Sequence, residues 1–437
     1  MCRRGSPARG GTPPPAPYPR TADADADDEE ARSVEEHRLN GRTLLVGHTA
    51  GHWRTTSLCL AVDFGSRHDP HGEGGTAHLL EHLLMSAPVA AGRSLAEHVQ
   101  RLGGSANAVT GLDRMLFQVR VLNRDAPETA ALLARAVLAP VVDEDMLEAE
   151  RRVVLQELAA ADADPSDVVQ DVFLGRIFAG HPLGRPVGGT REELLRATVS
   201  TVTGAHRDRF LRRPMRLAVV GGAPLAGLRE ALAGSPLGES ATGPDWPGDG
   251  AGEPRPLAPG RSVNWPADGF CWLSVGGRAP AAQDPERHAY TVLADLLGAN
   301  PASLLYRRLR VEHGLAYTFF AWSRAYRDTG AWRVMVGAES ANGPAVLGHV
   351  HALLTGLAEH GPDPEDLAVA RRQAVAALLT DTEDPAAHAQ QLATATDGPG
   401  ESGAEELEAV TADEVRRAAA RLCAELTAVV RPERETA

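Results

Sequence analysis

The sequence predicts an α+β protein that consists of two homologous domains. Along the chain, segments with the period-2 alternation of β-strands are interspersed with segments of helical periodicity. In addition, Leu147-Glu-Ala-Glu-Arg-Arg recurs as Leu367-Ala-Val-Ala-Arg-Arg at an offset of 220 residues, and Asp164-Pro165 recurs at the same offset. Because this unit is far longer than the roughly 20 to 50 residues of a solenoid repeat, the repeat indicates a duplicated domain.

The strands of the first half are indicated by alternating apolar residues. Alternation over residues 58–64 predicts a strand that ends at Gly65, and alternation over residues 117–121 predicts another. Shorter strands are expected at residues 107–110 and 216–220. The second half has a counterpart of the first strand that ends at Gly277, followed, as in the first half, by a loop and an apolar helix.

Helices are predicted between these strands. The last and longest of them must end near Asp164-Pro165, because proline disfavours helical conformation in the preceding residue. The expected helices are one that carries residues 78–82, one at 94–102 that ends at Gly103-Gly104, one at 128–138 and one at 143–161.

Composition divides the chain into four parts. Residues 1–35 are first rich in Pro, Gly and Arg and then acidic, so a disordered tail is expected. Residues 234–262 are rich in Gly, Pro and acids without periodicity, which indicates a linker. The N-terminal domain is therefore expected at residues 36–233 and the C-terminal domain at residues 263–432.

Overall charge and hydropathy exclude several classes of protein. The net charge of −14 argues against a nucleic-acid-binding protein, although all 44 basic residues are arginine. No apolar run of about 18 residues predicts a transmembrane helix, and the N-terminus has no apolar segment of the signal-peptide type. The four scattered cysteines predict neither a disulfide framework nor a Cys-type zinc site. A cytoplasmic protein is expected.

One short motif, His78-Leu-Leu-Glu81-His82, contains the residue types of a metal site. In a helix its three polar residues occupy one face of one turn. Two imidazoles one turn apart can bind a single Zn²⁺, and Glu81 could then act as a general base on a zinc-bound water. Two histidines on a helix also occur as an ordinary polar face, so the motif alone leaves both interpretations open.

A catalytic zinc ion requires a third protein ligand, and Glu157 on the predicted helix 143–161 is the candidate. Glu150 lies two turns earlier on the same face. At the offset of 220, the second copy has Ala370 and Ala377 in place of these two acids. A copy without the carboxylates indicates that they serve chemistry, whereas an ordinary solvated helix face is the simpler interpretation.

The His78-x-x-Glu81-His82 motif, followed by Glu157 after 74 intervening residues, resembles the pitrilysin/insulinase family of zinc peptidases. The resemblance covers about residues 38–432 and is strongest to small bacterial members similar to the β subunit of the mitochondrial processing peptidase. It implies two domains, each a mainly antiparallel β-sheet covered by helices. It also implies one Zn²⁺ per chain on His78, His82 and Glu157, with Glu81 as the base and Glu150 as support for a ligand.

Two further matches extend the resemblance. Asn107, Ala108 and Thr110 match the family's edge strand, on which a peptide substrate pairs as an extra strand. Arg310 and Tyr317 look like the family's Arg/Tyr pair, which acts from the C-terminal domain on the scissile peptide. Both side chains are suited to stabilising an oxyanion. Alone, they would be an exposed arginine and a half-buried tyrosine.

The resemblance implies a zinc metalloendopeptidase that hydrolyses unfolded peptides inside a closed chamber. One chain carries both the zinc motif and the Arg/Tyr pair, so a homodimer is expected, although a heterodimer is also compatible with the sequence. Two different roles stay open as well: a protease that removes leader peptides in a ribosomal-peptide pathway, and a non-catalytic structural subunit. The segment Gly298-Ala-Asn-Pro-Ala-Ser departs from the family, whose members are usually Gly/Ser-rich there.

Overall fold

The computed structural model describes residues 34–239, 254, 257, 260, 263–395 and 403–433. The predicted tail, apart from its last two residues, and most of the predicted linker lie outside these residues. Within the predicted linker, Leu237 is fully buried in the apolar core of the N-terminal domain. None of the described helices combines the length and the apolar character that crossing a bilayer requires.

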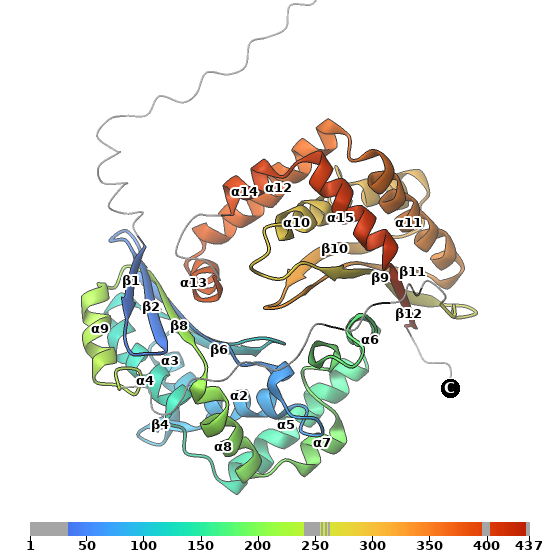
Figure 1. Cartoon of the computed structure of the whole chain (residues 1–437). Coiled ribbons are helices and arrows are strands. Elements are labelled where there is room, and N and C mark those ends of the chain that lie inside the picture. Colours follow the sequence, from blue (N-terminus) through green and yellow to red (C-terminus); the bar gives the residue numbers. More distant parts are fainter. Residues whose placement is uncertain are drawn as a thin grey trace, which may run out of the picture. The chain divides into compact units, whose positions relative to one another are not determined.

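The N-terminal domain contains a six-stranded sheet with the strand order β1-β2-β8-β3-β7-β6 (Figure 1). Every neighbouring pair is antiparallel except β2 and β8, which are parallel. β6 forms one edge of this sheet. The strands are β1 (Glu35–Arg38), β2 (Thr43–Thr49), β3 (Thr55–Val62), β6 (Ser105–Thr110), β7 (Met115–Leu122) and β8 (Met215–Gly221).

Helices cover one face of this sheet, and alternation along the strands explains why. Leu58, Leu60 and Val62 of β3 point into a core that also contains Leu79 and Leu83. Cys59 and Ala61 belong to a different apolar cluster on the opposite face. The helices are α2 (Thr76–Ser86), α3 (Leu95–Arg101), α4 (Ala126–Leu138), α5 (Glu144–Asp162), α6 (Pro165–Ile177), α7 (Arg191–Arg196), α8 (Val199–Asp208) and α9 (Leu225–Ala233), and a short β4–β5 hairpin (Pro88–Ala90, Arg93–Ser94) lies beside them.

The C-terminal domain contains a four-stranded antiparallel sheet with the strand order β10-β11-β9-β12. Its strands are β9 (Phe270–Ala279), β10 (Thr318–Ala325), β11 (Gly330–Glu339) and β12 (Thr427–Pro432). Its helices are α10 (Arg287–Leu297), the π-helix η5 (Tyr306–Glu312), α11 (Gly343–His360), α12 (Pro364–Glu383), α13 (Pro385–Thr394), α14 (Ala404–Ala409) and α15 (Ala412–Ala424).

The two sheets share one topology, which confirms the predicted α+β fold with two homologous domains. The order β10-β11-β9-β12 repeats the order β6-β7-β3-β8. Helices α5 and α12 begin 220 residues apart and are capped at their N-termini by Asp143 and Asp363. The end of α5 near Pro165 was predicted from the sequence, but α6 was not. Proline there occupies the first position of a new helix, where it needs no hydrogen-bond donor.

The helices that follow α5 and α12 are exchanged between the domains. Helix α6 places Val169, Phe173 and Ile177 in one apolar cluster with residues of the C-terminal sheet, among them Val429 of β12. Helix α13 likewise packs Ala389 and other residues against β3 and β8 of the N-terminal sheet. Each sheet therefore has one face covered by its own helices and the other face contacted by a helix of the other domain (Figure 1).

A buried arginine links the two domains. The Arg67 side chain is 1% exposed and donates hydrogen bonds to Asp113 at 2.7 Å and to both carboxylate oxygens of Asp328 at 2.8 and 2.7 Å. Asp328 belongs to the turn between β10 and β11. Burial alone would raise the pKa of Asp328, but the hydrogen bonds and the charge of Arg67 lower it overall.

We expect Asp328→Asn to lower the free energy of unfolding by about 2 kcal/mol at neutral pH, because it removes a charge-assisted pair from a buried guanidinium. The pKa of Asp328 is lowered in the folded protein, so its contribution exists above about pH 4 and is lost as the pH falls. Denaturant unfolding at several pH values measures both effects. As a control, Glu312→Gln at the exposed Arg308 pair should change the free energy by less than about 0.5 kcal/mol. Equal effects of the two substitutions would contradict this account.

Candidate metal centre

Helix α2 carries His78, Glu81 and His82, and its apolar residues are buried in the N-terminal core. The two imidazoles lie on one side of the helix with their ring centroids 4.8 Å apart. Glu81 is 8% exposed, which is unusual for a carboxylate. Packing of the leucines therefore determines where the polar residues of the motif point.

The start of α2 depends on glycines. Gly75 caps the helix with φ = +82°, a left-handed conformation that only glycine adopts without strain. A Cβ atom at Gly75 would lie 2.4 Å from the carbonyl oxygen of Gly188, and one at Gly189 would lie 2.2 Å from the backbone of Gly74. These two loops therefore pack backbone against backbone, which brings Gly188 beside His78.

Polar groups also hold the loop that precedes α2. The buried carboxylate of Asp69 accepts a hydrogen bond from the backbone N–H of Ala77 at 3.0 Å, in the first turn of α2. Arg185 donates to the carbonyl oxygens of Arg67, Asp69 and Pro70. Burial raises the pKa of Asp69 to about 7. This support was not predicted from the sequence, because Asp69 lies several residues before the N-cap Gly75 and so carries no local capping signal.

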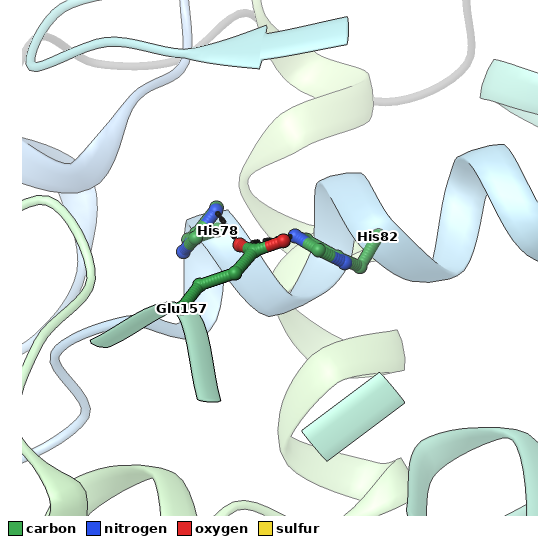
Figure 2. Close-up of side chains that lie close together, drawn as sticks. All are labelled: His78, His82 and Glu157. Carbon is green, nitrogen blue, oxygen red and sulfur yellow. Dashed lines mark ion pairs between the residues drawn. The ribbon is translucent and has the colours of Figure 1, made fainter. Parts of the chain in front are cut away.

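Helix α5 packs against α2 and brings Glu157 to the two imidazoles (Figure 2). Oε2 of Glu157 lies 3.3 Å from Nε2 of His82 and 3.7 Å from Nε2 of His78. The Glu157 side chain is 51% exposed, so the group of three opens to solvent on its side. Residues 75 positions apart in the sequence therefore meet through the contact of two helices.

The Nδ1 atoms of the two imidazoles have different surroundings. Nδ1 of His82 lies 3.2 Å from Oε2 of Glu150, which orients the ring so that Nε2 faces Glu157. Nδ1 of His78 is buried and has no hydrogen-bond partner within the described chain. Burial and the neighbouring His82 lower the pKa of His78, which favours the neutral imidazole that metals bind.

The carboxylate of Glu81 is hydrogen-bonded to the edge strand β6. Oγ1 of Thr110, the last residue of β6, donates a hydrogen bond to Oε2 of Glu81 at 2.5 Å. Burial raises the pKa of Glu81, and the hydrogen bond from Thr110 opposes this shift. A buried carboxylate with a raised pKa beside two imidazoles is suited to taking up and releasing a proton.

The donor set fits a zinc ion. One nitrogen from each imidazole and one carboxylate oxygen lie within 4.8 Å of one another, and in the described part of the chain no other group of three or more such residues does so. Two imidazoles and a carboxylate are a known ligand set of catalytic zinc, which leaves one position open. Oxygen-only cations such as Ca²⁺ would not select two imidazoles.

The residues expected on the edge strand have different surroundings. Asn107 is exposed, Ala108 is partly buried against the N-terminal core, and Thr110 is buried and bonded to Glu81. β6 pairs only with β7 among the described strands, so its outer edge offers backbone groups to an extended peptide.

Arg310 and Tyr317 lie together in the C-terminal domain. The guanidinium carbon of Arg310 lies 4.3 Å from the centre of the Tyr317 ring and 5.0 Å from that of Tyr306. Tyr317 is 75% exposed and immediately precedes the edge strand β10. Neither side chain forms a hydrogen bond or ion pair with the described residues of the metal centre.

Two family descriptions match successive parts of the chain. Residues 50–191, which include the metal centre, match the family described as Insulinase (Peptidase family M16). Residues 197–374 match the one described as Peptidase M16 inactive domain. The second description fits a C-terminal domain in which alanines replace Glu150 and Glu157.

Several bacterial proteins are similar over most of their length. A protein of Mycobacterium tuberculosis named "uncharacterized zinc protease" is 29% identical over 381 residues, which is 84% of this chain and 86% of the relative. A protein of the same description from Streptomyces coelicolor is 26% identical over 366 residues, 81% of this chain and 78% of the relative. The similarity therefore spans both domains.

Solved structures show the same fold. A protease from Helicobacter pylori superposes with a TM-score of 0.81 at 20% identity, over 91% of this chain and 99% of that one. A structure from Pseudomonas fluorescens, described as a peptidase M16 inactive domain, superposes with a TM-score of 0.79 at 18% identity, over 91% and 98%. At these identities the likeness establishes the arrangement of the two domains and no more.

We expect Glu150→Gln to weaken zinc binding roughly 10- to 100-fold, because it removes the carboxylate that orients the His82 ring. Competition with a chelator of known affinity measures the change. Glu144→Gln, in the exposed first turn of the same helix, is the matched control and should bind zinc as the wild type does. Equal zinc affinity of all three proteins would show that Glu150 has no part in holding the site.

Proposed function

The chain belongs to the insulinase family of peptidases, family M16, and from this premise we propose that it is a zinc-dependent metalloendopeptidase. The observation that carries the proposal is the convergence of His78, His82 and Glu157, with Glu81 buried on the same helix turn. The names of the bacterial relatives support zinc and proteolysis at the level of the family.

We assign the metal-binding role to His78 Nε2, His82 Nε2 and the carboxylate of Glu157. When bound, a zinc ion supplies Lewis-acid chemistry: it polarises a carbonyl group and makes a water molecule more acidic. Glu150 holds the His82 ring in the orientation that directs Nε2 toward Glu157. The open side of Glu157 gives the substrate access.

Glu81 acts as the general base and then as the general acid in this proposal. Its carboxylate accepts the proton of the attacking water and transfers it to the leaving amine. The Thr110 hydroxyl orients the carboxylate through Oε2. Burial, which raises the pKa of Glu81, makes its carboxylate a stronger base toward the attacking water than an exposed glutamate would be.

The substrate that fits this site is an extended peptide. The free edge of β6 would pair with its backbone, and strand addition of this kind reads the backbone more than the side chains. Strand β6 ends at Thr110, which contacts Glu81, so a peptide along this edge would pass the metal centre. Asn107 and Ala108 would lie along the same strand.

Arg310 and Tyr317 would complete the site from the C-terminal domain. A guanidinium and a phenol are suited to donating hydrogen bonds to a carbonyl oxygen as it gains negative charge. Both are exposed and hold each other by a cation–π contact, so they are accessible to a bound peptide. Because one chain carries both parts of the site, we propose a homodimer rather than a pair of different subunits, with a closed chamber for unfolded peptides.

Glu81→Gln should retain zinc but lower turnover of an unstructured peptide by roughly 10²- to 10⁴-fold, because an amide cannot accept the proton. His82→Ala should lose both zinc and turnover, because it removes a ligand. Elemental analysis and a fluorogenic peptide assay measure the two quantities. Glu192→Gln on the exposed face of α7 is the control and should behave as the wild type does.

Wild-type turnover by the Glu81→Gln protein would rule out the role of Glu81. A purified wild-type protein that contains no zinc, takes up none and cleaves no peptide would overturn the proposed function as a whole.

A further inference from the structure

The guanidinium group of Arg310 contacts a second aromatic ring besides that of Tyr317. Its central carbon lies 5.0 Å from the centre of the Tyr306 ring and 4.3 Å from that of Tyr317. Both distances are within the roughly 6 Å over which the face of an aromatic ring attracts a cation. Tyr306 is therefore in a position to influence Arg310, although the sequence did not mark it as part of the site.

The two rings differ in how firmly they are fixed. Tyr317 is 75% exposed and lies outside the described helices and strands. Tyr306 instead packs against the apolar core of the C-terminal domain. Its ring meets the ring of the buried Phe319 edge to face, with the centroids 6.3 Å apart. Tyr306 is thus the ring that the core holds in place.

The backbone that carries Tyr306 and Arg310 is also fixed. Both residues belong to the π-helix η5, in which they lie about one turn apart. At the start of η5, Oγ of the buried Ser303 accepts a hydrogen bond from the N–H of Tyr306 at 3.3 Å. Near its end, Leu309 is fully buried, and its carbonyl oxygen accepts from the N–H of Leu315 at 2.7 Å. Short π-helices are frequent at functional sites.

Carboxylates pair with the neighbouring arginines of η5 but not with Arg310. Arg307 donates a hydrogen bond to Asp366 at 2.7 Å, and Arg308 donates one to Glu312 at 2.7 Å. Among the described residues, the side chain of Arg310 forms no ion pair and no hydrogen bond, and it contacts the two rings instead. An aromatic face attracts a guanidinium without occupying its N–H groups. These groups therefore stay able to donate to a substrate.

We propose that Tyr306 is a positioning residue, whose ring fixes the Arg310 guanidinium where it can donate hydrogen bonds to the carbonyl oxygen of the scissile peptide bond. This inference rests on the proposed function, in which Arg310 stabilises that oxygen as it gains negative charge. A donor that is already fixed stabilises the charge better than a mobile one, because it does not have to reorganise during the reaction. Tyr306 acts only through Arg310.

Steady-state kinetics with an unstructured fluorogenic peptide test the proposal. Tyr306→Leu should lower kcat roughly 5- to 30-fold with little change in KM, because the lost contact supports the transition state rather than peptide binding. Tyr306→Met, which also fills the space without a ring, should behave as Tyr306→Leu does. Tyr306→Phe keeps an aromatic face and should retain the wild-type kcat. Arg308→Gln, on the same helix, is the matched control and should behave as the wild type does.

A double-mutant cycle distinguishes positioning from a merely structural role. In an Arg310→Leu background, Tyr306→Leu should cause little further loss of kcat, because the residue that it positions is gone. In an Arg308→Gln background, it should cause the same loss as in the wild type. Equal losses in the wild-type and Arg310→Leu backgrounds would overturn the proposal, as would full turnover by Tyr306→Leu.

NMR of the protein labelled with ¹⁵N-arginine tests the contact without any activity. The side-chain signal of Arg310, identified by its absence from Arg310→Leu, should move toward the value of free arginine in Tyr306→Leu and stay in place in Tyr306→Phe, because a ring shifts the signals of groups over its face. A wild type that cleaves no peptide would overturn the proposed function alone. The NMR signal would still decide whether Tyr306 positions Arg310, and a signal that does not move in Tyr306→Leu would show that it does not.

Discussion

The contact between helices α2 and α5 is the interaction on which the rest of the site depends. It places a carboxylate oxygen of Glu157 within 3.7 Å of two imidazole nitrogens that come from another part of the chain. The leucines of α2 pack in the N-terminal core, and glycines and Asp69 fix the start of the helix. Glu150 contacts the ring of His82. A donor set of this precision needs such support, because metal ligands must keep their geometry when no ion is bound.

Duplication explains how the protein can accommodate a polar site inside a packed domain. The C-terminal domain repeats the strand order and the α5-type helix but carries alanines at the two acidic positions. The repeated architecture therefore forms without the carboxylates, which supports our proposal that the N-terminal copy uses them for chemistry. Exchange of α6 and α13 joins the copies, so that neither sheet is complete without a helix from the other domain.

The two faces of the N-terminal sheet contact different elements because side chains alternate along each strand. One face supports α2 and hence the metal centre. The other carries α13 of the C-terminal domain. Arg67 provides a further polar link, between η1 (Ser66–His68), the turn between β6 and β7 that carries Asp113, and the β10–β11 turn of the C-terminal domain. The same turn carries Arg327, which bonds Asp63 of the N-terminal domain, so one segment of the C-terminal domain takes part in two links.

Local sequence determined much of this protein. Alternation located strands β3, β6, β7 and β8 of the N-terminal domain, and helical periodicity located α2 to α5. The constant offset of 220 residues revealed the duplication. Both signals depend only on neighbouring residues or on direct comparison. The spacing of His78, Glu81 and His82 likewise predicted from the sequence that they share one helix turn. Tertiary structure alone decided the pairing of Glu150 with His82, the bond from Thr110 to Glu81, the backbone contact of Gly75 with Gly188 and the exchange of α6 and α13. Each of these joins segments far apart in the chain, and their meeting depends on how sheets and helices pack, which no local pattern records.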